Sequence, residues 1–190
     1  MSHPQALDEL RTSRLNLRTP GRRDARDIHK AVAEPLDELV LWLPWAHPGY
    51  SLLDTRQFIS AVRRLRRSGQ SFDYLIESVD ESGVLGMISL HRIDWLRQCA
   101  GLGYWIRRSA WGQGLATEAA RALIDVGFCS YGLNRIEAHV APPNRASQAV
   151  IEKLGLNREG VSRGIEKLNG EFVDHIQYAI LSADYVVAGR

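Results

Sequence analysis

Hydrophobic and polar residues recur along the chain with the two periods that distinguish strands from helices. Short runs that alternate, or that are apolar between turn residues, predict strands at 14–18, 72–77, 84–91, 100–106, 135–140, 160–168 and 172–181. Apolar residues spaced three and four apart predict helices at 24–33, 55–67, 116–131 and 144–155. This order of elements predicts a single α/β or α+β domain built on one mixed sheet.

Turn residues support the boundaries of these elements. Asn169-Gly170 separates the last two predicted strands and is the strongest short hairpin signal. Gly132 and Gly155 follow the two C-terminal predicted helices, where a left-handed residue commonly ends a helix. The chain therefore predicts a closing hairpin after its last long helix.

Three segments have less regular patterns. Residues 1–12 are expected to form a loose arm, and residues 39–50 combine two Trp, one Tyr and two Pro, which favours an aromatic loop. That loop either folds onto the core or forms a wall of a substrate pocket. The helix at 55–67 carries Arg63, Arg64, Arg66 and Arg67 opposite its apolar face. These arginines are expected to be solvated, or to attract an acidic partner.

Composition narrows the class of protein. The 190 residues suit one domain that spans 1–190 and has its own core. Of these residues, 45% are hydrophobic and 24% are charged. A net charge of +2 argues against a dedicated nucleic-acid binder. Two cysteines, Cys99 and Cys129, form no metal-ligand pattern, so no metal site is expected. The N-terminus lacks a secretory profile and no segment is long enough to span a bilayer, so a cytoplasmic location is expected.

The most informative segment lies between the strand at 100–106 and the longest predicted helix. Gly112 and Gly114 let the backbone approach a ligand closely, and the first N–H groups of a helix lack internal partners. Such a helix end binds anions, although a glycine turn that only reverses the chain has the same pattern. No lysine follows Gly114, which excludes a P-loop, and Thr117 breaks the dinucleotide fingerprint.

At this point the chain resembles the GCN5-related N-acetyltransferases (GNAT), in particular the subgroup that acetylates ribosomal-protein N-termini (Rim-type). WGQGLATEA at 111–119 is similar to the acyl-CoA pyrophosphate loop, with Trp111 where Gln or Arg is usual, and GYW at 103–105 precedes it. NRAS at 144–147 with EKLGL at 152–156, and EKLNGEFVDH at 166–175, resemble two further subgroup motifs. The resemblance covers about 14–180. It implies a GNAT-like domain with a mixed, mostly antiparallel sheet flanked by helices.

The resemblance also implies acetyl-CoA as cosubstrate and a set of residues that bind it. The pantetheine arm would pair with the strand at Tyr104, Trp105 and Ile106, and the diphosphate would lie on Gly112, Gln113, Gly114, Leu115, Ala116 and Thr117. Asn144 would bond the pantetheine amides, although Asn is also a good helix N-cap. A homodimer is a further expectation of the family.

Two catalytic roles follow from the same resemblance. Ser147 would donate a hydrogen bond or relay a proton to the departing thiolate, unless it is an ordinary first-turn serine. Glu166 would be the general base, unless it is an exposed strand carboxylate. Many relatives instead place a glutamate two residues before GYW, where this chain has Gly101. The other candidate bases are His91, Glu77, Asp94 and His175.

The acceptor is expected to be a weakly basic amine. Deprotonating a lysine at pH 7 costs roughly 4.6 kcal/mol, against about 1.1 kcal/mol for an α-amino group. Without a strong base in evidence, a protein N-terminus or an amino sugar is easier to acetylate than a lysine. The alternatives are a small-molecule amine acetyltransferase, acting on an antibiotic or a polyamine, and a module that binds acyl-CoA without catalysis.

Overall fold

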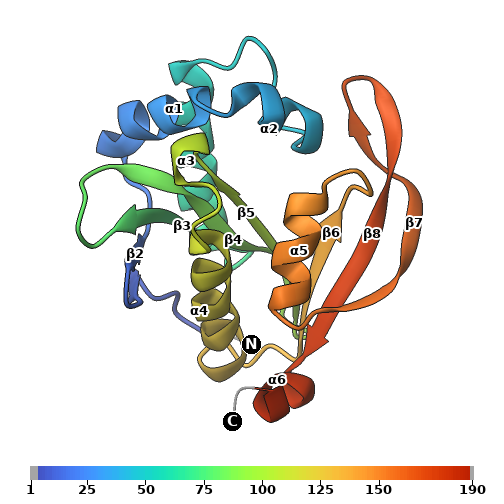
Figure 1. The fold of residues 1–190 in the computed structure, drawn as a ribbon. Helices are drawn as coiled ribbons and strands as arrows, with labels where there is room; N and C mark the ends of the chain where they lie inside the picture. The colour runs from blue at the N-terminus through green and yellow to red at the C-terminus, as the bar shows by residue number, and fades with distance from the viewer. Residues whose placement is uncertain (1–3, 189–190) are drawn as a thin grey trace.

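The computed structural model describes residues 4–188, and these form one eight-stranded sheet with helices on both faces (Figure 1). The N-terminal half contains the following elements: β1 (Glu9–Arg11), β2 (Leu15–Arg18), α1 (Ala25–Ala33), α2 (Leu36–Trp42), α3 (Leu52–Arg67), β3 (Ser71–Ser78) and β4 (Val84–Asp94). The C-terminal half contains β5 (Cys99–Ile106), α4 (Leu115–Cys129), β6 (Arg135–Val140), α5 (Arg145–Lys153), β7 (Asn157–Leu168), β8 (Glu171–Leu181) and α6 (Ser182–Ala188). Short 3-10 turns lie at Arg22–Asp24 and Arg108–Ala110. No helix within 4–188 is long and apolar enough to cross a membrane.

The strands lie in the order β1-β2-β3-β4-β5-β6-β8-β7, and every neighbouring pair is antiparallel except β5–β6. The mixed, mostly antiparallel sheet expected from the resemblance is therefore confirmed. The β5–β6 pair extends over only three residues of each strand, from Cys99 to Gly101 and from Arg135 to Glu137. Beyond Gly101 the sheet opens between β5 and β6.

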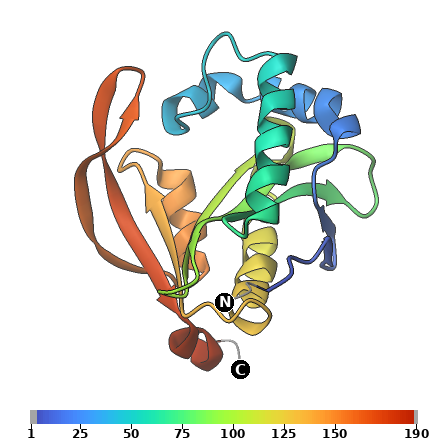
Figure 2. The same ribbon diagram turned by 180° about the vertical axis from the view of Figure 1, so that it is seen from behind.

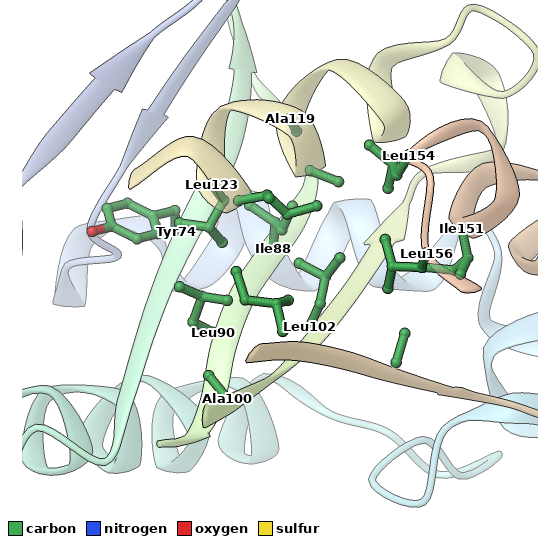
Figure 3. Packing of buried hydrophobic residues seen from close by; sticks show 14 of the residues in the cluster. Tyr74, Ile88, Leu90, Ala100, Leu102, Ala119, Leu123, Ile151, Leu154 and Leu156 are labelled. Carbon is green, nitrogen blue, oxygen red and sulfur yellow. The ribbon is translucent and has the colours of Figure 1, made fainter. Parts of the chain in front are cut away.

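The two faces of the sheet are covered by different helices. Helices α4 and α5 lie in front in Figure 1, and α3 lies in front when the molecule is turned to Figure 2. On the α4 side, Ile88, Leu90 and Leu102 of the sheet pack against Leu123 and its neighbours (Figure 3). On the opposite side, a second cluster that includes Met87 packs beneath α1 and α3. Because side chains alternate along each strand, the sheet has a separate hydrophobic core on each of its two faces. Each face can therefore carry a site of its own.

The N-terminal segment departs from the expected loose arm. Residues 1–3 lie outside the described residues, but Glu9–Arg11 forms β1, and the Leu7 N–H donates to the Tyr131 hydroxyl over 3.0 Å. Arg66, expected to be solvated, instead donates to the Leu7 carbonyl over 2.6 Å. Its side chain is only 13% exposed and lies over the Tyr74 ring. The prediction was wrong here because these bonds depend on partners about sixty or more residues away.

The aromatic segment also differs from the prediction. Its first part is helix α2, which begins after Pro35, has Asp37 and Glu38 in its first turn, and ends before Pro44. Acidic residues at a helix N-terminus are favourable, and a proline disfavours helical geometry in the residue before it. The loop prediction therefore holds only from Leu43 onward. Asn169, at the tip of the β7–β8 hairpin, donates its side-chain amide to the Val40 carbonyl over 3.1 Å.

Candidate functional site

The glycine turn between β5 and α4 has the open geometry that the sequence predicts. Gly112 and Gly114 have φ values of +74° and +75°, a left-handed conformation that other residues adopt at a cost. Gly114 is the N-cap of α4, and the segment from Trp111 to Gly114 is exposed. The first N–H groups of α4 have no intrahelical partner and carry the positive end of the helix dipole. The turn is therefore shaped and charged to hold an anion.

Two side chains hold this turn in place. The Trp111 indole N–H donates to the Ile106 carbonyl at the end of β5 over 2.7 Å. On the other side, Arg14 donates to the Gln113 carbonyl over 3.0 Å and to the Glu118 carboxylate over 2.6 Å. Burial raises the pKa of Glu118, but hydrogen bonds from Thr12 and Arg14 outweigh it and hold the pKa below its usual value. The carboxylate thus ties the first turn of α4 to the start of β2.

Where β5 leaves β6, one backbone edge of β5 has no strand of the described chain (4–188) beside it. This edge includes Tyr104, Trp105 and Ile106, the residues expected to pair with a pantetheine arm. The side chains alternate: Tyr104 packs toward the core on the α4 face, and Trp105 packs toward the cluster under α1 and α3. A chain of amides can add to such a free edge as a strand would.

Asn144 and Ser147 lie on the other side of this opening, at the start of α5. The Asn144 side-chain oxygen accepts from the Ser147 backbone N–H over 3.1 Å, so the N-cap interpretation is confirmed. The cap uses the oxygen and leaves the amide NH₂ group for another acceptor. The Ser147 hydroxyl lies 3.0 Å from the Tyr104 hydroxyl across the opening, and burial raises the pKa of Tyr104 to about 12. Tyr104 is therefore a neutral hydrogen-bonding partner that orients Ser147.

A cavity of about 510 Å³ lies mainly on the α1 and α3 face of the sheet. Its floor includes Ser89, Gly103 and Trp105, but Leu102 and Tyr104 from the other face of β5 also line it. The cavity therefore reaches into the opening between β5 and β6. A group bound from the α4 face and a group bound in the cavity can meet there.

The aromatic segment forms one wall of this cavity. Trp42 at the end of α2, together with Trp45 and Tyr50, lines it. The Trp45 ring lies 5.5 Å from the Tyr50 ring and 6.4 Å from the Trp105 ring, so the wall is joined to the sheet floor. The segment also folds onto the core, where Leu39 and Ala46 are buried, so that interpretation is confirmed; its role as a wall of a substrate pocket stays a prediction.

Titratable groups gather at the end of the cavity nearest β6, β7 and β8. Glu166 lines it from β7, and the other members are His91 on β4, Glu137 and His139 on β6, and His175 on β8. Burial lowers the pKa of His175, whose Nε2 is enclosed without a hydrogen-bond partner, while Glu166 acts in the opposite direction. Within 4–188 no group of three or more such side chains is arranged to hold a metal ion.

Two of the candidate bases considered from the sequence lie elsewhere. Glu77 accepts from Arg18 over 2.7 Å at the β2–β3 pair. Asp94 accepts from the Arg97 N–H in the β4–β5 turn over 2.9 Å. Both carboxylates therefore have structural roles outside the cavity, which leaves Glu166, His91 and His175 among the candidates named.

Asp73, Glu137 and His139 are among the cavity residues that the sequence reasoning did not single out. Burial raises the pKa of Asp73 to about 6, and a hydrogen bond from Ser71 lowers it only in part. The sequence carried one signal for these residues, the alternation of side chains along a strand. Asp73, Glu137 and His139 alternate with apolar residues and so face one side of the sheet. Alternation alone does not reveal that a cavity lies on that side.

These two regions suit the two halves of an acyl transfer. The turn at 112–117 and the Asn144 amide can hold an acidic, amide-rich cosubstrate such as acetyl-CoA, because they present N–H donors along its path. The free edge of β5 leads from that turn toward Ser147 and the cavity. The cavity supplies carboxylates and imidazoles, which can attract an amine and accept its proton.

Comparison with known proteins agrees with this arrangement. The sequence model described as the Acetyltransferase (GNAT) domain matches residues 14–157. The chain is 33% identical over 181 residues to the uncharacterized N-acetyltransferase p20 of Bacillus licheniformis, covering 94% of this chain and 99% of that one. It is 32% identical to the ribosomal-protein-serine acetyltransferase of Escherichia coli, covering 82% and 92%.

A solved structure extends the match to the fold. RimJ of Mycobacterium smegmatis, in complex with CoA-disulfide, superposes with a TM-score of 0.85 at 26% identity, covering 100% of this chain and 98% of that one. The family model spans well over half of the chain, and the relatives span nearly all of it. The chain therefore belongs to the GNAT family of acetyltransferases.

Proposed function

We propose that this enzyme transfers the acetyl group of acetyl-CoA to the α-amino group at the N-terminus of a protein. The observation that carries the proposal is the cavity of about 510 Å³ that reaches the free edge of β5 from the face opposite the glycine turn. The E. coli relative is named for acetylation of a ribosomal protein, which supports a protein acceptor of that class. An α-amino group also costs less to deprotonate than a lysine side chain.

In the proposed reaction the amine attacks the thioester directly. The diphosphate lies on the turn at 112–117, the pantetheine arm pairs with β5 at Tyr104–Ile106, and the Asn144 amide bonds that arm. A backbone N–H of β5 polarises the thioester carbonyl as negative charge develops on its oxygen. Neither cysteine is needed as a nucleophile, since Cys99 lies at the start of β5 and Cys129 at the exposed end of α4.

In the proposed reaction Ser147 acts on the leaving thiolate and Glu166 acts on the attacking amine. Ser147, oriented by Tyr104, donates a hydrogen bond to the sulfur of the departing thiolate. Glu166 attracts the ammonium form of the acceptor and accepts its proton from the β7 side. General acid–base groups of this kind typically contribute about 10²–10⁴-fold in rate.

The test measures CoA release with N-terminal peptides and, separately, with a panel of small amines. Peptides with a free α-amine are expected to be acetylated, and the same peptides with a blocked N-terminus and a free lysine are not. Mass spectrometry of the product locates the acetyl group. Turnover of the small amines alone would favour the small-molecule alternative, and CoA binding without any turnover would favour a non-catalytic module.

Ser147→Ala and Glu166→Gln test the two roles in the same assay. Each is expected to lower kcat by about 10²-fold while CoA still stabilises the protein against heating. Wild-type rates in both variants would contradict the assignments without contradicting the fold. The homodimer stays a prediction, which light scattering in solution checks, and so does the cytoplasmic location.

A further inference from the structure

The imidazole of His91 occupies an unusual position on the floor of the cavity. A Cβ atom built at Gly101, the β5 residue opposite His91, would lie 2.6 Å from Cε1 of the ring, closer than real Cβ contacts allow. A Cβ at Gly103 would lie 3.2 Å from Nε2. The ring therefore lies across two β5 residues that have no side chains, and it fills the space that a side chain at 101 would take.

This position is beside the opening where β5 leaves β6. Gly101 is the last β5 residue that pairs with β6, and its partner is Glu137. The register thus places His91, Gly101 and Glu137 in one row across three strands, on the face that lines the cavity. An acceptor nitrogen that enters the opening from the cavity passes this row.

The ring is available for a ligand because the protein does not use it. Within 4–188, neither nitrogen of His91 takes part in a hydrogen bond or an ion pair. Burial, together with the electrostatic effect of Arg92 and His139, lowers the pKa of His91 to about 4, against the opposite effect of Glu137. At neutral pH the imidazole is therefore unprotonated and presents a lone pair. The remaining charged or titratable groups around the cavity are Tyr50, Asp54, Asp73, Tyr104, Glu166 and His175.

We infer that His91 is a second proton acceptor of the acetyl transfer, placed on the sheet floor across the cavity from Glu166. The inference rests on the proposed function. Glu166 takes the first proton of the ammonium, and the neutral nitrogen then forms the N–C bond with the thioester carbon. The nitrogen of this adduct is far more acidic than a free ammonium, and it gives its second proton to the imidazole. The C–S bond breaks and its electron pair leaves on sulfur, which takes a proton from water through Ser147. Glu166 and the imidazolium release their protons to water.

The role predicts a pH dependence that a packing role does not. Above about pH 4 the imidazole of the wild-type enzyme is unprotonated, so its own titration does not limit the rate near neutral pH. Without His91 the second proton has to leave to hydroxide or to a buffer base. The deficit of a His91 variant should therefore be largest at pH 7 and should shrink as the pH approaches 9, where hydroxide is far more abundant.

His91→Asn tests this with N-terminal peptides, with kcat/KM measured from pH 6.5 to 9. The expected result at pH 7 is a loss of about 10²-fold that shrinks at least tenfold by pH 9. The loss should also shrink at pH 7 when free imidazole is added as an external base. His47→Asn, which removes an exposed imidazole outside the cavity, should keep the wild-type profile.

Gly101→Ala provides a second variant that keeps the imidazole but displaces it, because of the 2.6 Å approach. It should show the same pH-dependent deficit, with CoA affinity by calorimetry unchanged in both variants. Wild-type kcat/KM in His91→Asn, or a deficit equal at every pH and unchanged by added imidazole, would overturn the inference. Failure of the wild-type enzyme to acetylate any N-terminal peptide would instead overturn the proposed function.

Discussion

The turn at 112–117 and the cavity on the opposite face differ in how the chain builds them. The turn is continuous in sequence, and its shape follows from two residues with positive φ, Gly112 and Gly114. The cavity draws its walls from α1, α2, α3 and six strands, and its carboxylates and imidazoles come from α3 and from five of those strands. A local backbone geometry can be read from a short motif, whereas a cavity depends on how distant segments pack. Variants on the two sides should therefore affect different properties.

The largest expected effect is on the free energy of unfolding and comes from Asp73, which lines the cavity. Because burial raises the pKa of Asp73 to about 6 from an unfolded value near 3.9, its acid form is the one that the fold favours. The wild-type protein thus loses stability as the pH rises from about 4 to about 6, by roughly 3 kcal/mol in all. Asp73→Asn should recover up to about that amount at pH 7 and little at pH 4.

Urea unfolding at both pH values checks this prediction. Asp80→Asn, at an exposed position in the β3–β4 turn, is the matched control and should leave stability unchanged at both. A gain for Asp73→Asn that is independent of pH, or a loss at pH 7, would show that ionised Asp73 is compensated in the folded protein.

The next effect concerns the turn. Gly114→Ala forces a side chain into the left-handed conformation, which costs about 1–2 kcal/mol. If that cost is met by movement of the turn, the dissociation constant for CoA should rise about 5- to 30-fold, as calorimetry would measure. The KM for the peptide acceptor should not change. Gly160→Ala, where a Cβ meets nothing within 4 Å and φ is not positive, should bind CoA as the wild type does; equal affinity in both variants would contradict the anion role of the turn.

The smallest effect separates two tryptophans. Trp45→Ala removes ring contacts with Tyr50 and Trp105, worth about 0.5–1.5 kcal/mol per pair. The KM for the peptide should rise about 3- to 10-fold, and CoA affinity should stay the same. Trp111→Ala, which loses the bond to the Ile106 carbonyl, should do the reverse. Parallel changes in both constants for both variants would mean that the two regions are not independent.

Elements set by local sequence were predicted correctly, and features that depend on distant contacts were not. Strand β6 and the hairpin turn at Asn169-Gly170 were predicted as they are found, because alternation and turn chemistry are local. Helix α2 was missed, because the aromatic residues of this segment favoured a loop. The prolines at its two ends and the acidic residues in its first turn were the signals for a helix. The bond from Arg66 to the Leu7 carbonyl could not be predicted, since no periodic pattern links these residues.

The candidate site divides in the same way. Gly112, Gly114, Asn144 and Ser147 were found from motifs; the structure places the two glycines in the turn between β5 and α4, and Asn144 and Ser147 at the start of α5 opposite Tyr104. Asp73, Glu137 and His139 could not be singled out, because a polar residue in a half-buried strand usually faces solvent. The covering of that face by α1, α2 and α3 is a property of the whole fold.

The short pairing of β5 with β6 has a consequence for the design of ligands. In the proposed reaction the donor and the acceptor approach from opposite sides, because the strands part after Gly101, and they join within the thickness of the sheet. A bisubstrate compound that links CoA to a peptide N-terminus would have to thread this gap, with a slender connecting unit at Gly103 and bulk only beyond it. Branching next to the connecting atom should abolish binding of the compound even where each half alone still binds.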